Sequence, residues 1–176
     1  MFLGVDLGTS GIKLVLTDDS GAIVDSASCA FEVSRPKPLW SEQNPQDWWD
    51  GFCAAMDKLH AQHDLSGIQA IGFAGQMHGA TLLDEHQQVL RPAILWNDGR
   101  CEAQCEEIEQ RVPNAREITG NIIMPGFTAP KLLWVKQHEP ELFAKIDKVL
   151  LPKDYLRLLL SGDFASDMSD AAGTMW

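Results

Sequence analysis

Basic residues are few and scattered in this sequence of 176 residues. Lysine and arginine number 14 against 25 aspartates and glutamates, and 14 − 25 gives a formal net charge of −11 at pH 7. Proteins that bind nucleic acid or an anionic membrane surface take much of their affinity from clustered lysine and arginine, and no such cluster occurs here. Both kinds of partner are therefore disfavoured.

Long hydrophobic runs are also missing. The most apolar stretches, 148–151 and 156–160, are far shorter than the roughly 20 residues that span a bilayer. Residues 1–6 have neither the basic start nor the apolar segment of a signal peptide. We therefore expect a cytoplasmic location and no membrane partner.

Cysteine is sparse, with four residues in a chain that shows no export signal. Reduced thiols are therefore expected rather than a disulfide framework. Cys101 and Cys105 are four residues apart and could share one helix face. A zinc ion would need two further ligands, and no matching pair lies nearby in the sequence. Plain thiols are the better interpretation.

The composition is that of a folded protein, with 45% hydrophobic and 22% charged residues, and its length suits one domain of roughly 100–200 residues. Apolar alternation predicts three strands first, at 2–6, 12–16 and 22–30. Glycine-containing turns at 8–11 and 18–21 separate them. Because these connections are short, we expect the three strands to be antiparallel.

A helix is expected to begin at Asn44-Pro45, after an extended proline-containing connection over 32–45. Its apolar residues recur at helical spacing and favour core packing over a ligand-binding box. They are Trp48, Trp49, Phe52, Cys53, Met56 and Leu59.

The rest of the chain alternates between strand and helix patterns. Strands are predicted at 68–74 (buried), 80–83 and 148–151, and helices at 102–111, 131–138, 141–146 and 154–160. This order predicts an α/β domain with a mixed sheet and helices on its faces. The chain ends on Trp176, an apolar residue that a compact domain rarely exposes, so we expect it to be part of a longer protein.

The strongest chemical motif is the turn between the first two strands. Asp6, at a strand end, could hold a hydrated Mg²⁺, while Gly8, Thr9, Ser10 and Gly11 could offer amides and hydroxyls to phosphate oxygens. On spacing alone, an ordinary glycine-rich turn is an equally good interpretation. The motif is neither a Walker A loop nor a GxGxxG turn.

Residues 6–11 resemble the first phosphate motif of the actin-like sugar kinases, and especially the carbohydrate kinases that include glycerol kinase and xylulokinase. Five further stretches are similar to the pentulose kinases of this family in order and spacing. They are PLWSEQ at 38–43, GQMHG at 75–79, LWNDGR at 95–100, PGFTAPKL at 125–132, and residues 166–175. The resemblance covers essentially the whole chain. It implies the actin-like (ribonuclease H-like) fold of an N-terminal kinase domain, with the family's C-terminal domain absent.

The resemblance implies transfer of the ATP γ-phosphoryl group, assisted by Mg²⁺, to a ketose. D-xylulose is the first expectation, another ketose or polyol such as L-ribulose is the alternative, and a non-catalytic sugar-binding module is a third. Asp6 would be the catalytic carboxylate on the metal side, and residues 8–11 would bind phosphate. Lys13 stands where the family has an arginine near the phosphates, although it could equally be a solvated strand residue. The base and the adenosine pocket belong to the absent domain, so the isolated chain should be inactive. A homodimer is possible.

The resemblance also assigns sugar contacts to Met77 and His78; without it, His78 would be an ordinary loop residue. Glycerol kinases carry a tyrosine at the position of Gly126, so the glycine here should leave room for a longer polyol.

Two polar clusters remain open. Asn97 and Asp98 could bind sugar hydroxyls. For Asp98, a structural ion pair with Arg100 is an equally good interpretation. Asp167 and Asp170 could shape the wall of the sugar cleft or cap a turn.

Overall fold

The computed structural model describes residues 1–176 and divides them into two compact units. Unit 1 comprises Met1–Val33 and Pro45–Gln76, and unit 2 comprises Ser34–Asn44 and Met77–Trp176. Both units are therefore discontinuous in sequence.

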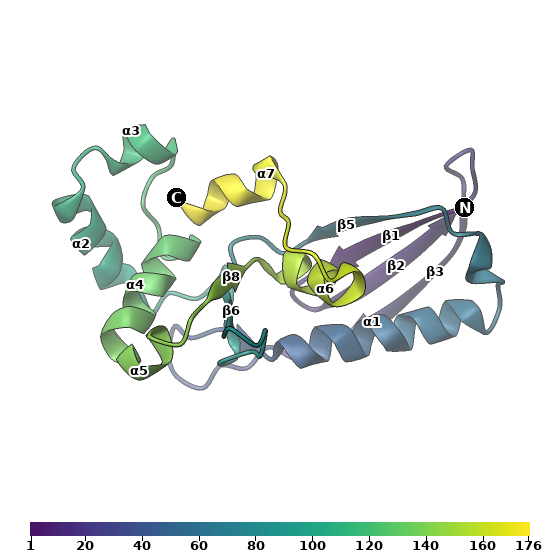
Figure 1. Ribbon diagram of the computed structural model, residues 1–176, viewed down its shortest axis with the longest axis horizontal. Coiled ribbons are helices and arrows are strands. Elements are labelled where there is room, and N and C mark those ends of the chain that lie inside the picture. Colours follow the sequence, from purple (N-terminus) through teal and green to yellow (C-terminus); the bar gives the residue numbers. More distant parts are fainter. The chain divides into compact units, whose positions relative to one another are not determined.

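Unit 1 is built on a sheet of four strands in the order β3-β2-β1-β5. The first three, β1 (Phe2–Leu7), β2 (Gly11–Thr17) and β3 (Ile23–Ala30), are antiparallel neighbours. The fourth, β5 (Ala70–Gly75), runs parallel to β1 (Figure 1). The predicted antiparallel start and the mixed sheet are both confirmed.

One face of this sheet is covered by α1 (Pro45–His60), which packs against β2 and β3. Trp48, Phe52 and Leu59 of the helix are buried, so the aromatic stripe is core packing, as predicted. The strand residues buried on this face alternate along β1 and β2, as a half-buried strand requires. They are Leu3, Val5, Leu7, Ile12, Leu14 and Leu16.

The predicted strand at 68–74 exists, but the prediction that it is buried was wrong. The strand exists as β5, preceded by the 3₁₀ turn η1 (Leu65–Gly67), but most of its residues are exposed, with Ile71 at 40%. β5 is an edge strand, and α1 packs instead on the strands at the opposite side of the sheet. An apolar run indicates a strand but does not say whether anything covers it.

Unit 2 contains two short antiparallel pairs and most of the helices. β4 (Glu42–Gln43) pairs with β7 (Ala93–Ile94), and β6 (Thr81–Leu83) pairs with β8 (Lys148–Leu150). The helices are α2 (Glu102–Arg111), α3 (Ala115–Thr119), α4 (Thr128–His138), α5 (Pro140–Phe143), α6 (Pro152–Ser161) and α7 (Met168–Ala171), with the 3₁₀ turn η2 (Ala172–Thr174) at the end.

A hydrophobic cluster between these elements forms the core of unit 2. Its buried members are Ala80, Leu82, Ile94, Cys101, Trp134 and Val135. Helix α2 has the predicted bounds, whereas α4 and α6 begin two or three residues before the predicted starts. In α6 the added first residue is Pro152, whose fixed φ suits a first helical turn.

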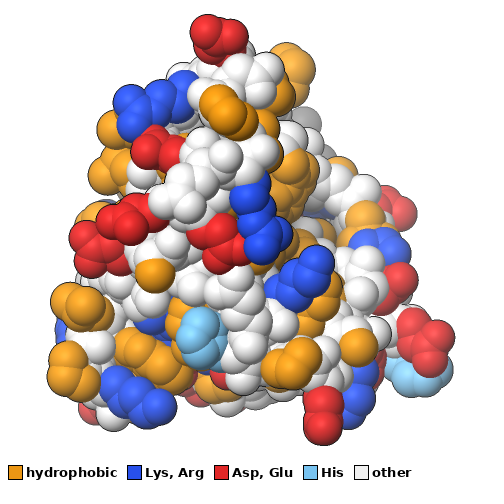
Figure 2. Space-filling model, turned by 90° about the vertical axis from the view of Figure 1, so that its left-hand side faces the viewer, with side chains coloured by type: hydrophobic (Ala, Val, Ile, Leu, Met, Phe, Trp, Pro, Cys, Tyr) orange, Lys and Arg blue, Asp and Glu red, His pale blue; other side chains and the backbone are white.

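Basic side chains do not cluster on the side of unit 2 that carries α2, α3 and α5. Figure 2 shows acidic and basic side chains interspersed among hydrophobic ones on this face. No helix in the chain has both the length and the apolar character needed to cross a membrane.

Candidate functional site

The turn between β1 and β2 presents the predicted phosphate residues in unit 1. Asp6 lies opposite Lys13 in the strand register, and both side chains are exposed. Their neighbours Leu7 and Ile12 are buried on the α1 side of the sheet, so Asp6 and Lys13 point to the other face. The backbone amide of Phe31 donates to the carbonyl of Ser10 at 2.9 Å, which fixes the turn to the end of β3.

Close packing against the neighbouring strand requires a glycine at position 11 of this turn. A Cβ at this position would lie 2.5 Å from the carbonyl oxygen of Cys29 on the neighbouring strand, and backbone atoms cannot move aside cheaply. We expect Gly11→Ala to lower the free energy of unfolding by about 1–3 kcal/mol. Urea unfolding measures this effect.

Gly72→Ala is the matched control, because a Cβ at this strand position meets nothing within 4 Å. It should leave the free energy of unfolding unchanged within about 0.5 kcal/mol. Equal losses in the two variants would contradict a steric role for Gly11.

The donor set of the turn suits a magnesium ion that is held mostly by phosphates. No group of three or more histidine, cysteine, aspartate or glutamate side chains in the chain could hold a metal by itself. Mg²⁺ commonly takes one or two protein carboxylates and completes its shell with water and substrate phosphates. Asp6, an exposed carboxylate beside a turn with Thr9 and Ser10, fits that pattern.

His78 is the most unusual residue among the predicted sugar contacts. Its backbone is left-handed, with φ at 61°, a conformation that is uncommon for residues other than glycine. Its ring packs edge-on against Phe127 at 4.7 Å between centroids. A Cβ on Gly173 would lie 2.1 Å from a ring carbon, so only glycine at 173 leaves room for this ring. The imidazole Nδ1 is buried without a hydrogen-bond partner.

The electrostatics around His78 favour a neutral imidazole. Burial lowers the pKa of His78 below its ordinary value, and the nearby Lys131 lowers it further, while Asp170 and the backbone of Gly173 act in the opposite direction. A neutral imidazole can donate one hydrogen bond and accept another, which suits sugar hydroxyls. The preceding residue, Met77, is 52% exposed.

Lys131 was not among the residues predicted for the site, although its ammonium contacts the main chain at His78. The side chain is fully buried, and its ammonium donates to the carbonyl oxygens of His78 at 2.8 Å and Gly126 at 2.6 Å. Burial lowers the pKa of Lys131 to about 7. In the sequence, Lys131 lies within the motif PGFTAPKL at 125–132 and is the one charged residue of the largely apolar stretch 127–135, but neither feature reveals its partners.

The C-terminal stretch 166–175 is attached to α6 through Lys153. Its ammonium pairs with Asp154 at 2.6 Å, Asp167 at 2.9 Å and Asp170 at 3.1 Å. Burial by itself would lower the pKa of Lys153, but its three carboxylate partners raise that pKa on balance. Asp167 also caps α7 by accepting from the Asp170 amide at 2.9 Å, so the turn-capping interpretation is confirmed for Asp167. The result is a fixed segment that carries Gly173.

Asp98 forms the structural bridge that the sequence left open. Its carboxylate accepts from the Ser41 amide at 2.6 Å and from the Arg100 guanidinium at 2.7 Å, and its side chain is 0% exposed. The same guanidinium pairs with Glu42 at 2.8 Å and lies 3.6 Å from the centroid of the Trp40 ring. Because its carboxylate is enclosed in this way, Asp98 serves to hold its loop.

Asn97 is exposed, unlike its neighbour Asp98. It lines a hollow of about 430 Å³ together with residues 35–41. Gly126 lies beside the same loop, since a Cβ there would be 2.9 Å from the Trp96 carbonyl oxygen. The glycine is therefore required by this close approach, in addition to any space that it leaves for a substrate.

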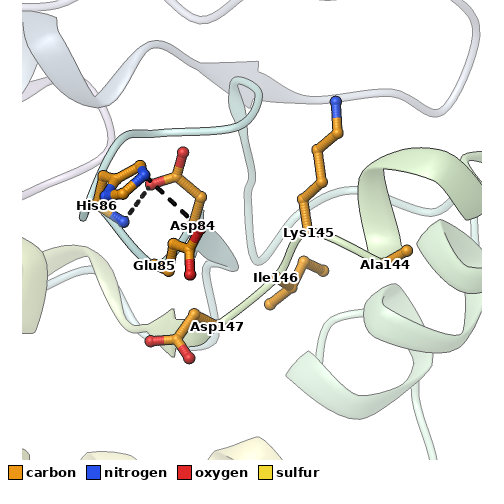
Figure 3. Close-up of a pocket in the computed structure, with 7 residues that line it drawn as sticks. All are labelled: Asp84, Glu85, His86, Ala144, Lys145, Ile146 and Asp147. Carbon is orange, nitrogen blue, oxygen red and sulfur yellow. Dashed lines mark hydrogen bonds and ion pairs between the residues drawn. The ribbon is translucent and has the colours of Figure 1, made fainter.

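A second hollow of about 430 Å³ contains none of the predicted site residues. Figure 3 shows its lining from two loops, 84–86 and 144–147. The Asp84 carboxylate accepts from the His86 amide at 2.9 Å, and the Lys145 side chain points away from the acidic residues (Figure 3). These loop-internal contacts and solvent-facing charges do not form a site of chemistry.

The fold and these motifs define a carbohydrate kinase domain. The model of the FGGY family of carbohydrate kinases, N-terminal domain, matches residues 1–176, and the chain belongs to this family. The solved structures that it resembles share the actin-like ATPase fold of these kinases.

Within the family, the chain is similar to several proteins named as xylulose kinases. It is 64% identical over its whole length to the xylulose kinase of Escherichia coli strain K12, of which it covers 36%. It superposes on the crystal structure of a xylulose kinase from Brucella ovis with a TM-score of 0.97, at 54% identity, covering 99% of this chain and 36% of that one. A glycerol kinase from Plasmodium falciparum solved with ADP gives a TM-score of 0.90 at 25% identity, covering 99% of this chain and 37% of that one. The chain thus spans about a third of the length of these relatives.

Proposed function

We propose that the complete protein phosphorylates D-xylulose with ATP to give D-xylulose 5-phosphate, and that this chain is its N-terminal sugar- and phosphate-binding domain. The observation that carries the proposal is the 64% identity with a protein named xylulose kinase, which extends over all 176 residues. The site residues described above lie inside that matched region.

Unit 2 supplies the sugar contacts in this proposal. His78 offers a neutral imidazole to a hydroxyl, and Met77 covers the apolar edge of the sugar. Asn97 is a further donor and acceptor for hydroxyls. Asp98, with its carboxylate already enclosed, holds the loop that carries Asn97.

Unit 1 supplies the phosphate contacts. Asp6 would hold a Mg²⁺ bound together with ATP, and the amides and hydroxyls of residues 8–11 would orient the phosphates, with Lys13 adding positive charge. Bound ATP and Mg²⁺ supply the phosphoryl group and neutralise its charge. The base that accepts the sugar proton lies outside this chain in the proposal, so the 176-residue chain alone should not turn over.

A coupled assay of ADP release with the complete protein tests the sugar. D-xylulose, L-ribulose and glycerol are compared at matched concentrations, and the proposal expects the highest kcat/KM for D-xylulose. A higher kcat/KM for L-ribulose would favour the alternative of another ketose kinase. Sugar-dependent turnover by the 176-residue chain itself would refute the assignment of the base to another part of the protein.

A non-catalytic sugar-binding module is the other class of function to be tested. Quenching of tryptophan fluorescence by D-xylulose without any ADP release from the complete protein would favour it. A cytoplasmic location and a homodimer remain predictions, which cell fractionation and sedimentation would test.

A further inference from the structure

The main chain at His78 is held from one side by helix α4. The His78 carbonyl oxygen accepts from the Lys131 ammonium at 2.8 Å and from the Thr128 hydroxyl at 3.2 Å. Lys131 donates in addition to the Gly126 carbonyl at 2.6 Å. One buried ammonium therefore joins the loop that carries His78 to the loop that precedes α4.

The two donors to the His78 carbonyl, Lys131 and Thr128, form a clamp from α4. This clamp holds a backbone conformation that is energetically unfavourable without such support. A histidine with φ at 61° sits in the left-handed region, and such residues persist only where the surroundings over-determine them. Two donors on one carbonyl oxygen, one of them charged, provide that constraint. The ring itself packs against Phe127 and beside Gly173, so a displaced main chain at His78 would take the imidazole out of this position.

We infer that Lys131 is a positioning residue for the sugar site: its ammonium holds the left-handed main chain at His78 and thereby aims the imidazole at the substrate. This inference rests on the proposed function, since it takes His78 to contact the sugar. Lys131 itself has no exposed surface, so it acts through His78 and touches no substrate.

A buried lysine in this position is costly, which argues for a specific role. Desolvation lowers its pKa to about 7, while Asp98 and Cys101 oppose that effect and Arg100 adds to it. An apolar residue of similar volume would avoid the desolvation penalty. What such a residue could not supply is the pair of hydrogen bonds to the two carbonyl oxygens.

The test replaces Lys131 by methionine in the complete protein, with Lys136→Met as the control from the exposed side of the same helix. We expect Lys131→Met to raise the KM for the sugar by on the order of tenfold. The KM for ATP and kcat should stay within about threefold, because the hydrogen bonds of Lys131 go to His78 and Gly126 and not to the predicted phosphate residues. Equal sugar KM values in the two methionine variants would overturn the inference.

A second readout is independent of enzyme activity. Lys131 is one of the charges that lower the pKa of His78, while Asp170 opposes it. NMR titration of ¹⁵N-histidine-labelled protein should therefore show a higher His78 pKa in Lys131→Met than in the parent, and no change in Lys136→Met. An unchanged His78 pKa in Lys131→Met would overturn the inference about Lys131, whether or not the protein phosphorylates a sugar. A raised His78 pKa in a protein that phosphorylates no sugar would instead reject only the proposed function.

Thr128→Val covers the case in which Lys131→Met fails to fold. It removes the other donor to the His78 carbonyl and keeps the bond between Lys131 and Gly126. The expected rise in sugar KM is smaller, about threefold, again with the KM for ATP unchanged. A Thr128→Val enzyme with parental sugar KM would contradict the role of this carbonyl in aiming the imidazole.

Discussion

Replacement of Asp6 by asparagine is expected to lower the kcat of sugar phosphorylation by on the order of 100-fold or more, equivalent to about 2.7 kcal/mol of lost transition-state stabilisation. The amide keeps the size of the side chain but removes the negative charge that would hold Mg²⁺ against the phosphates. The KM for the sugar should change by less than about threefold, because the proposed sugar contacts, Met77, His78 and Asn97, belong to unit 2. Steady-state kinetics with both substrates varied gives the measurement.

The competing explanation for Asp6 is purely structural. Asp6 lies opposite Lys13 on neighbouring strands, and such a cross-strand pair contributes roughly 0.2–1 kcal/mol to stability. If this were its whole role, Asp6→Asn would lower the melting temperature slightly and leave kcat unchanged. Asp47→Asn, an exposed carboxylate in the first turn of α1, is the control for the general effect of losing one negative charge.

The sheet of unit 1 could be predicted well because each early strand has one buried face. Alternation of Leu3, Val5 and Leu7 with polar or small residues marks β1, and Asp6 is placed on the open face by the same alternation. The short elements β4, β7, α3 and α7 have too few residues to show a period, so no pattern predicted them. The division into two compact units also has no local signal, since each unit is assembled from separate stretches of the chain.

The candidate sugar site could be predicted only in part, for a different reason. His78 was identified through a motif resemblance, but its left-handed backbone and its contact with Gly173 depend on segments almost one hundred residues apart. Asp98 had two equally good interpretations because a carboxylate does not reveal its partner in sequence. Lys131 lies within the motif PGFTAPKL, but its burial and its partners could not be predicted, because burial of a lysine is decided by tertiary packing.

Gly173→Ala should damage sugar binding by displacing His78. The new Cβ would lie 2.1 Å from a carbon and 2.2 Å from Nδ1 of the imidazole, so the ring or the terminal segment must move. The segment is fixed to α6 by Lys153 through Asp167 and Asp170, and we therefore expect the ring to give way. A displacement of about 1 Å can cost up to 100-fold in a positioned contact, and we expect a rise in sugar KM of at least about tenfold.

A double-mutant cycle with His78→Asn decides whether the effect of Gly173→Ala passes through the imidazole. Asparagine tolerates the left-handed backbone and lacks the ring, so the pair of variants isolates the contact between Gly173 and the imidazole. If the clash is the cause, Gly173→Ala adds less than about twofold to sugar KM in the His78→Asn background, because the ring is already gone. Additive effects in the double variant would instead mean that Gly173 acts on the sugar independently of His78, and the ring would then owe its orientation to the clamp from α4 alone.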